Sequence, residues 1–365
     1  MKKLLLTTAI AGVMVSGSAF AQTTITGELR LNYKSIGNVA TGAGATASTG
    51  AIQGFGQEQQ INVQTKGKLN VGGLDYAAGF SLENDGAQST TLFNENTYMD
   101  FTNASSGTTL SIGRDHVQRS DSDRSAAVLV GFSPNELSAD GPTSSRTIFS
   151  QNIGPATGQA LGATILQKTP YGTFNYTYAP SGNADQTTTA SSNTSSFGSE
   201  AASENDEESA YEYGFTGDLG VKGLNLYYFK SEQKKSQGVA AQIKDSEAKS
   251  IGVSYNMGQF SVGYADKRYN FIKTSGGTGS TAGTNDITEK HYGVAYAVNN
   301  TLSVGAIYAK GDFSGGSASQ KTRGVNIGYN LGPVAMTVGY AQNTDVGGTT
   351  GAENNQGMIR FIGAF

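Results

Sequence analysis

The sequence predicts an all-β protein, a transmembrane antiparallel β-barrel of sixteen strands, and three observations carry this prediction. Stretches of about ten residues alternate between apolar and polar side chains, and no long segment has the helical period. Tight turns alternate with long polar loops along the chain, as they do in membrane barrels. The chain ends on an alternating strand whose last residue, Phe365, is aromatic.

Alternation divides each predicted strand into two faces, because successive strand side chains point to opposite sides. In residues 250–257 the apolar face holds Ile251, Val253, Tyr255 and Met257. The opposite faces are rich in Gly, Ser, Asn, Ala and Thr, and many apolar faces end in Tyr, as an aromatic girdle at a membrane interface requires. Such strands fit a wall with lipid on one side and water on the other.

The connections support the same fold. Short links at residues 71–73, 104–106, 299–300 and 332 alternate with long polar loops at 36–56, 180–208, 272–286 and 345–353. One link departs from this order: a strand predicted at residues 143–153 is followed by residues 154–170, which should form a turn but contain an alternating segment at 161–166. That segment either extends a neighbouring strand or adds another one.

The two ends of the chain indicate export. Residues 1–21 begin with Lys2 and Lys3, continue with an apolar run and close on Ala19-Phe20-Ala21, so we expect a cleaved signal peptide followed by a single barrel domain over residues 22–365. The apolar run is well short of the ~20 residues that span a bilayer as a helix. The last strand resembles the terminal strand by which outer-membrane barrels are recognised, so Phe365 is the expected insertion signal.

Composition excludes several function classes. The formal net charge of −4 is too acidic for a nucleic-acid binder. The chain has no cysteine, which excludes disulfides, thiolate metal sites and cysteine nucleophiles. Its two histidines, His116 and His291, have no second ligand nearby at the spacing of a transition-metal site. We therefore expect no enzymatic activity and no cofactor.

Three motifs together resemble the Gram-negative general-diffusion porins. They are the first strand at residues 24–33 (TITGELRLNY), the end of the fifth strand at residues 110–114 (LSIGR) and the terminal Phe365. The resemblance covers the whole mature chain. It implies a homotrimer in the outer membrane of a Gram-negative bacterium, in contact with lipid and lipopolysaccharide. It also implies a third loop that folds into the lumen and narrows it.

Loop three is expected at residues 116–142. The expected acidic side of the constriction consists of Asp121, Asp123, Glu136 and Asp140. Residues 134–141 (PNELSADG) are similar to the Pro-Glu-Phe-Gly-Gly-Asp tip of the enterobacterial relatives but depart from it. The presence of the constriction follows from the resemblance, whereas the path of the loop does not.

The opposite wall of the lumen is expected to be basic. Strand parity turns Arg30, Lys66 and Arg360 into the lumen, and we place all three near mid-height. Arg114 has the parity of the outward residues of its strand, so it reaches the pore only if the strand bends or bulges there. An acidic loop facing a basic wall would create a transverse field across the narrowest section.

One further acidic cluster lies in a long loop. Glu204, Asp206, Glu207 and Glu208 offer hard oxygen ligands, so a weak Ca²⁺ site that bridges to lipopolysaccharide phosphates is one interpretation. Solvated loop charge is the other, and the more common, interpretation.

The sequence therefore predicts passive diffusion of ions and small hydrophilic solutes through a water-filled channel. A solute-specific channel is the first alternative and would need an aromatic track or a dense Arg/Lys ladder in the lumen; Tyr98, Tyr227 and Tyr269 have inward parity but form no obvious track. A structural or adhesive barrel is the second alternative, suggested only by the Ser/Thr-rich stretch at residues 187–203. The choice between cations and anions stays open at this stage.

Overall fold

The computed structural model describes the barrel strands, several of the links between them and part of one long loop. The described residues are 22–40, 52–69, 71–85, 93–114, 125–138, 161–179, 209–233, 246–270, 286–314, 316 and 318–365. None of the helices in these ranges is long and apolar enough to cross a membrane.

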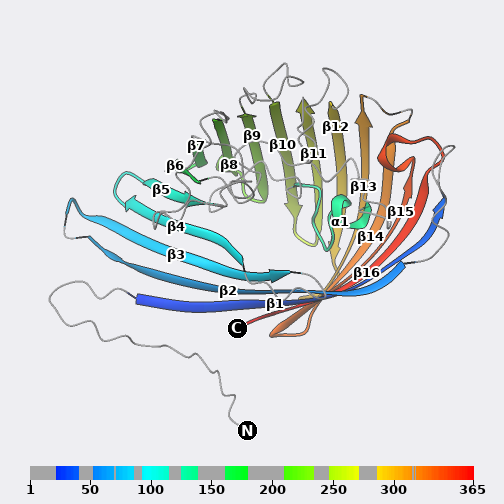
Figure 1. The fold of residues 1–365 in the computed structure, drawn as a ribbon, viewed down its shortest axis with the longest axis horizontal. Helices are drawn as coiled ribbons and strands as arrows, with labels where there is room; N and C mark the ends of the chain where they lie inside the picture. Colours follow the sequence, from blue (N-terminus) through cyan, green and yellow to red (C-terminus); the bar gives the residue numbers. More distant parts are fainter. Residues whose placement is uncertain are drawn as a thin grey trace, which may run out of the picture.

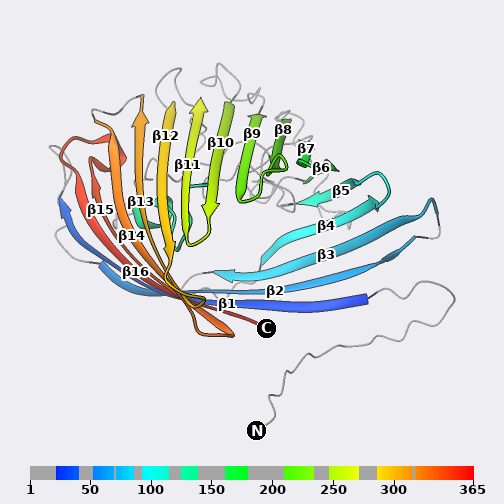
Figure 2. The same cartoon turned by 180° about the vertical axis from the view of Figure 1, so that it is seen from behind.

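In the described residues, sixteen antiparallel strands form one closed barrel, which confirms the predicted fold class and strand number (Figures 1 and 2). The strands are β1 (Gln22–Ala40), β2 (Ile52–Lys68), β3 (Leu74–Asp85), β4 (Phe93–Asn103), β5 (Thr108–Arg114), β6 (Leu161–Thr169), β7 (Gly172–Ala179), β8 (Ala210–Gly217), β9 (Leu224–Gln233), β10 (Ser246–Met257), β11 (Phe260–Asn270), β12 (Ile287–Ala297), β13 (Leu302–Phe313), β14 (Gln320–Asn330), β15 (Val334–Thr344) and β16 (Glu353–Ala364). The described residues also contain two short helices, α1 (Pro134–Ser138) and a 3-10 turn (Val346–Gly348).

One predicted strand was wrong. The sixth strand of the barrel is β6, which pairs with β5 on one side and β7 on the other, whereas residues 143–153, predicted for this position, lie outside the described residues. Its apolar residues face the same side as those of β5, with Leu110 opposite Ile165 and Ile112 opposite Ala163. The alternating segment inside residues 154–170 is therefore the strand itself, and the connection from β5 to β6 runs over residues 115–160.

The two faces of the wall have opposite character. Outward side chains are apolar and exposed, as with Ile251 (52 % exposed) and Val294 (55 %). Inward side chains are mostly polar and many are buried, as with Asn326 (3 %) and Gln356 (fully buried). A barrel in lipid needs this arrangement, because its outer face meets hydrocarbon and its inner face meets water.

The barrel closes where β1 pairs with β16, and Phe365 extends this seam by one residue pair. The N–H of Gly27 donates to the carbonyl of Phe365 at 2.8 Å, and the N–H of Phe365 donates to the carbonyl of Gly27 at 3.0 Å. A Cβ added at Gly27 would lie only 2.2 Å from Cζ of Phe365. The aromatic ring therefore covers the space that the glycine leaves, a pairing that stabilises strand edges.

We expect deletion of Phe365 to reduce the yield of folded barrel severalfold, because two hydrogen bonds of the seam and the ring over Gly27 disappear together. Phe365→Tyr keeps both and serves as the matched control. The measurement is the fraction of heat-modifiable protein in outer-membrane preparations. A normal fraction from the deletion would contradict the role given to this residue.

Candidate functional site

The described part of the β5–β6 connection, residues 125–138, packs against the inward face of the wall. Asn326 of β14 holds the backbone of Phe132: its Nδ2 donates to the Phe132 carbonyl at 3.1 Å, and its Oδ1 accepts from the Phe132 N–H at 3.3 Å. Asn343 of β15 donates from Nδ2 to the carbonyl of Leu137 at 2.9 Å. Figure 1 shows α1 beside the C-terminal strands, and it contacts β13 to β16.

Wall glycines let this segment approach closely. A Cβ added at Gly263 of β11 would lie 2.0 Å from the carbonyl oxygen of Ala126, and one added at Gly293 of β12 would lie 1.9 Å from that of Ala127. Real side chains do not tolerate such distances. The backbone of residues 126–127 thus lies directly on the wall at positions where the sequence supplies no side chain.

Helix α1 begins with local signals that the sequence contains. Ser133 precedes the helix, Pro134 occupies its first position, and Glu136 stands three residues after the serine. The Ser133 N–H donates to Oε2 of Glu136 at 2.8 Å, and the Glu136 N–H donates to Oγ of Ser133 at 3.2 Å. This is a reciprocal capping box with proline in its favoured place. The cap fixes the carboxylate of Glu136 at the start of the helix.

An apolar cluster fastens the segment to the inward face. Phe132 and Leu137 are fully buried against Ile307, Ala341 and Met358 of the wall. Full burial of a large apolar side chain contributes about 1.5–3 kcal/mol. The inward face of β13, β15 and β16 is thus apolar where Phe132 and Leu137 pack against it.

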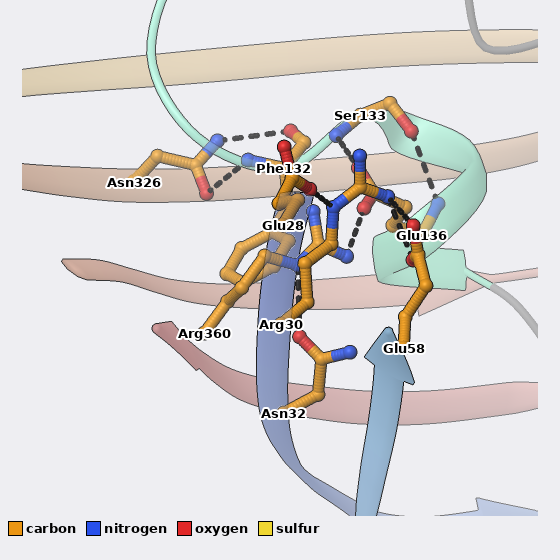
Figure 3. A network of polar contacts seen from close by, with 9 residues as sticks. All are labelled: Glu28, Arg30, Asn32, Glu58, Phe132, Ser133, Glu136, Asn326 and Arg360. Atoms are coloured by element: carbon orange, nitrogen blue, oxygen red, sulfur yellow. Dashed lines mark hydrogen bonds and ion pairs between the residues drawn. The ribbon is translucent and has the colours of Figure 1, made fainter. Parts of the chain in front are cut away.

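Arg360 connects the segment to the barrel seam (Figure 3). Its guanidinium group forms an ion pair with Glu136 and donates from Nε to Oδ1 of Asn32 on β1 at 2.8 Å. The same group lies over the ring of Phe132, 4.7 Å from the ring centre, in a cation–π contact. One side chain of β16 therefore contacts β1, the helix cap and the apolar cluster.

Arg30 lies next to this network, held between two carboxylates of the wall (Figure 3). Its Nη1 donates to Oε2 of Glu58 on β2 at 2.7 Å, and its Nε is paired with Glu28 on its own strand. Glu58 is the direct cross-strand partner of Arg30. The sequence analysis did not name Glu28 or Glu58 as site residues, although both have the inward parity of Arg30.

The start of the segment meets a buried polar group. Oγ of Ser125 lies 3.0 Å from Nδ1 of His291, whose Nε2 lies 3.3 Å from Oε2 of Glu289. His291 and Glu289 are 2 % exposed and fully buried. The three side chains lie in a row, but the burial of two of them gives a substrate no access. We assign them to anchoring residues 125–127 on β12.

The other predicted site residues have different outcomes. Lys66 points inward, but it pairs with Gln22, the first residue of β1, and so lies at the turn end of the wall and not at mid-height. Eight residues separate Gln22 from Arg30, roughly 26 Å along a strand. Arg114 is the last residue of β5, and its side chain lies outside the described part. The remaining predicted acidic residues also lie outside the described part: Asp121, Asp123, Asp140, Glu204, Asp206, Glu207 and Glu208.

Comparisons with known proteins agree with this architecture. The family model described as Gram-negative porin matches residues 7–349. The chain belongs to this family. It is an outer-membrane β-barrel channel for diffusion, and not an enzyme.

Solved porins share the fold at low sequence identity. An anion-selective porin from Comamonas acidovorans is 13 % identical with a TM-score of 0.65, over 95 % of this chain and all of that one. OmpF of Salmonella typhi, in complex with daunomycin, is 11 % identical with a TM-score of 0.62, over 94 % and 98 % of the two chains. The channel DcaP of Acinetobacter baumannii is 14 % identical with a TM-score of 0.57, over 94 % and 97 %. No curated protein sequence matches the chain.

The close approach of residues 126–127 to Gly263 and Gly293 can be tested directly. We expect the double variant Gly263→Val/Gly293→Val to push residues 126–127 off the wall and to change single-channel conductance by about twofold or more, because a side chain cannot share that space. Gly54 on the inward face of β2 has nothing within 4 Å of an added Cβ, so Gly54→Val is the control. The measurement is conductance in planar bilayers. Unchanged conductance in the folded double variant would show that the segment does not border the open channel.

Proposed function

We propose that the β5–β6 connection folds into the lumen and narrows a water-filled channel for ions and small hydrophilic solutes. The observation that carries this proposal is the ion pair between Glu136 in the loop and Arg360 on the wall. An acidic loop residue and a basic wall residue meet inside a closed barrel, as a charged constriction requires. The wall cations of this constriction are Arg30 and Arg360, and Glu136 is its acidic loop residue.

A solute-specific channel is less well supported. Such a channel needs aromatic rings presented to the passing solute, and the inward tyrosines do not present them. Tyr227 is 2 % exposed and stacks on Phe229, and Tyr269 is 1 % exposed. Tyr98 accepts a hydrogen bond from Gln64 on the wall. The rings of Tyr227 and Tyr269 are thus buried in the wall and Tyr98 is half-buried against it, so the three do not form a track.

The charges at this site support a mild preference for cations. The network in Figure 3 contains three carboxylates, those of Glu28, Glu58 and Glu136, and two guanidinium groups, those of Arg30 and Arg360. Each guanidinium group is paired, so neither offers an uncompensated positive charge to a passing anion. The Comamonas porin is anion-selective, but likeness at 13 % identity extends to the fold alone. We therefore assign the cation preference to the wall glutamates as well as to the loop.

Planar-bilayer recording tests the function. The purified protein should conduct without added ligand, in steps that grow with salt concentration, and no sugar or amino acid should block it at low concentration. Block by one solute would favour the specific channel. Absence of conductance in correctly folded protein would contradict diffusion through the lumen.

The reversal potential in a salt gradient tests the charge assignment. Glu28→Gln/Glu58→Gln should move it toward anion preference, because Arg30 then loses both compensating charges. A unit charge about 4 Å from an ion changes its energy by about 1 kcal/mol in water, or roughly fivefold in relative permeability, so a clear change of sign is expected. Asp312→Asn, an outward carboxylate on β13, is the control. A parent-like potential in the double variant would mean that these glutamates lie away from the ion path.

We also propose a homotrimer, from the family resemblance and the outward face of the seam. Small and apolar side chains lie there, among them Gly27, Leu29, Ile359 and Phe361, of which Leu29 and Phe361 are exposed in the single chain. Light scattering in mild detergent should give three times the chain mass after subtraction of detergent. A monodisperse monomer would contradict the trimer.

A further inference from the structure

An open cavity lies at the end of the barrel where tight turns join β12 to β13 and β14 to β15. Its volume is about 480 Å³, which falls within the roughly 300–1,000 Å³ of small-molecule sites. Inward side chains of β13, β15 and β16 line it, among them Ser303, Ala335 and Ile362. We call this cavity the turn-end pocket.

The turn-end pocket borders the loop segment that packs on the wall. Gly328 lines the pocket, and a Cβ added there would lie 3.3 Å from Cγ1 of Val130. Thr337 also lines it, and its Cγ2 would lie 2.9 Å from a Cβ added at Gly131. Tight turns mark the periplasmic side of a membrane barrel. The pocket therefore lies on the periplasmic side of the segment, where a solute leaves the channel.

Two asparagines hold the turns that form the edge of the pocket. Oδ1 of Asn299 accepts from the N–H groups of Thr301 and Leu302 at 2.8 and 2.9 Å. Oδ1 of Asn330 accepts from the N–H of Gly332 at 2.8 Å. The N–H of Asn330 donates to the carbonyl of Thr301 at 2.8 Å and joins the two turns. The edge is thus held in one shape before a ligand arrives.

The same bonds leave neutral donors and acceptors free. Because each asparagine oxygen is bound to its own turn, Nδ2 is the free end of the side chain, and neither Nδ2 has a partner among the described residues. The Thr301 hydroxyl donates to Asn299 at 2.9 Å, so its oxygen can still accept. Ser303 and Thr337 add two further hydroxyl groups. Of the described residues that line the pocket, none carries a charge.

We propose that the turn-end pocket binds neutral sugars. The hydroxyl groups of a sugar both donate and accept, and the lining supplies both kinds of partner. The C–H face of the sugar lies against Ala335, Ile362 and Ala364. An ion would lose hydration there and gain no opposite charge, so charged solutes are disfavoured.

This inference rests on the proposed function and deepens it, because it names a class of solute for which the diffusion channel has affinity. The pocket is open, so binding is weak. It lies among the turns at the edge of the lumen, and a weakly bound sugar there agrees with a channel that sugars do not block at low concentration. Selection by size and charge remains with the constriction.

Lactose and lactobionate are the probes, since they are of similar size and only lactobionate carries a carboxylate. Binding is measured by calorimetry and saturation-transfer NMR on the full protein, in a detergent without a sugar headgroup. Lactose should bind saturably and at least about fivefold more tightly than lactobionate, because the neutral lining does not compensate for desolvation of the carboxylate. Equal affinities, or a lactose signal that does not saturate, would overturn the proposal.

Asn299→Asp/Asn330→Asp removes both free Nδ2 donors and keeps an oxygen for the N–H groups of each turn. This variant should bind lactose roughly fivefold or more weakly, since each lost hydrogen bond changes affinity severalfold. Asn103→Asp is the matched control, because Oδ1 of Asn103 accepts from Ser105 and Ser106 in the β4–β5 turn in the same way, outside the pocket. It should bind lactose as the parent does. Parent-like binding by the double variant would overturn the proposal.

A second variant fills the pocket without changing its polar groups. Ala335 is exposed, so Ala335→Phe should fold normally and lose lactose binding. Heat-modifiability of every variant reports the folded barrel. Conductance without sugar separates the two proposals: a channel that conducts but binds no lactose would contradict the pocket alone, whereas a folded protein that does not conduct would contradict the proposed function.

Discussion

A backbone inside a bilayer has no water with which to form hydrogen bonds, so every strand must be paired on both sides. The pairing of β1 with β16 closes the barrel and removes its last two open edges. Without this seam, two strands of twelve or more residues would expose their N–H and C=O groups to hydrocarbon, at several kcal/mol for each unsatisfied group. The seam runs from the Glu28–Ala364 pair to the end of β1, and the Gly27–Phe365 pair extends it. Every other feature of the protein lies inside or outside this closed wall.

In a closed barrel, alternate residues of each strand point outward to lipid and inward to the lumen, so the two faces differ in their chemistry. Outward positions meet lipid and are apolar, as with Val294 and Val325. Inward positions can be polar, so the wall offers Asn326 and Asn343 as hydrogen-bond partners for a loop backbone. The loop in turn buries Phe132 and Leu137 on the few apolar inward residues. A closed barrel with a polar interior is thus a scaffold on which one loop can be fixed.

Much of the fold follows from the sequence because period-2 alternation and turn chemistry are local properties. Alternation alone turns Arg360 inward and Phe361 outward, and the structure agrees. The sixth strand was misplaced because residues 143–153 and 161–169 both alternate weakly, and only cross-strand pairing with β5 decides between them. The capping box at Ser133 and Glu136 was a readable signal for α1 that the sequence analysis did not use.

The site was harder to predict because it depends on register. The height of Lys66 follows from its pairing with Gln22, and no local pattern reveals which residues of β1 and β2 stand opposite each other. The same register places Glu58 opposite Arg30. The wall was expected to be basic there, but its positive charge is paired with a carboxylate. Charge type and parity were thus available from the sequence, whereas the compensation of each charge needed the three-dimensional arrangement.

The most direct test of the central claim is a cross-link between the loop and the wall. A Cβ at Gly305 on the inward face of β13 would lie 3.1 Å from Cβ of Val130, so a shift of a few tenths of an ångström brings the pair to the roughly 3.5–4.5 Å between Cβ atoms in a disulfide, and the chain has no cysteine of its own. Val130→Cys/Gly305→Cys should form a disulfide in the membrane, and conductance should be the same before and after reduction. Absence of the cross-link in folded protein, or a conductance that recovers only on reduction, would contradict a loop held on the wall of the open channel.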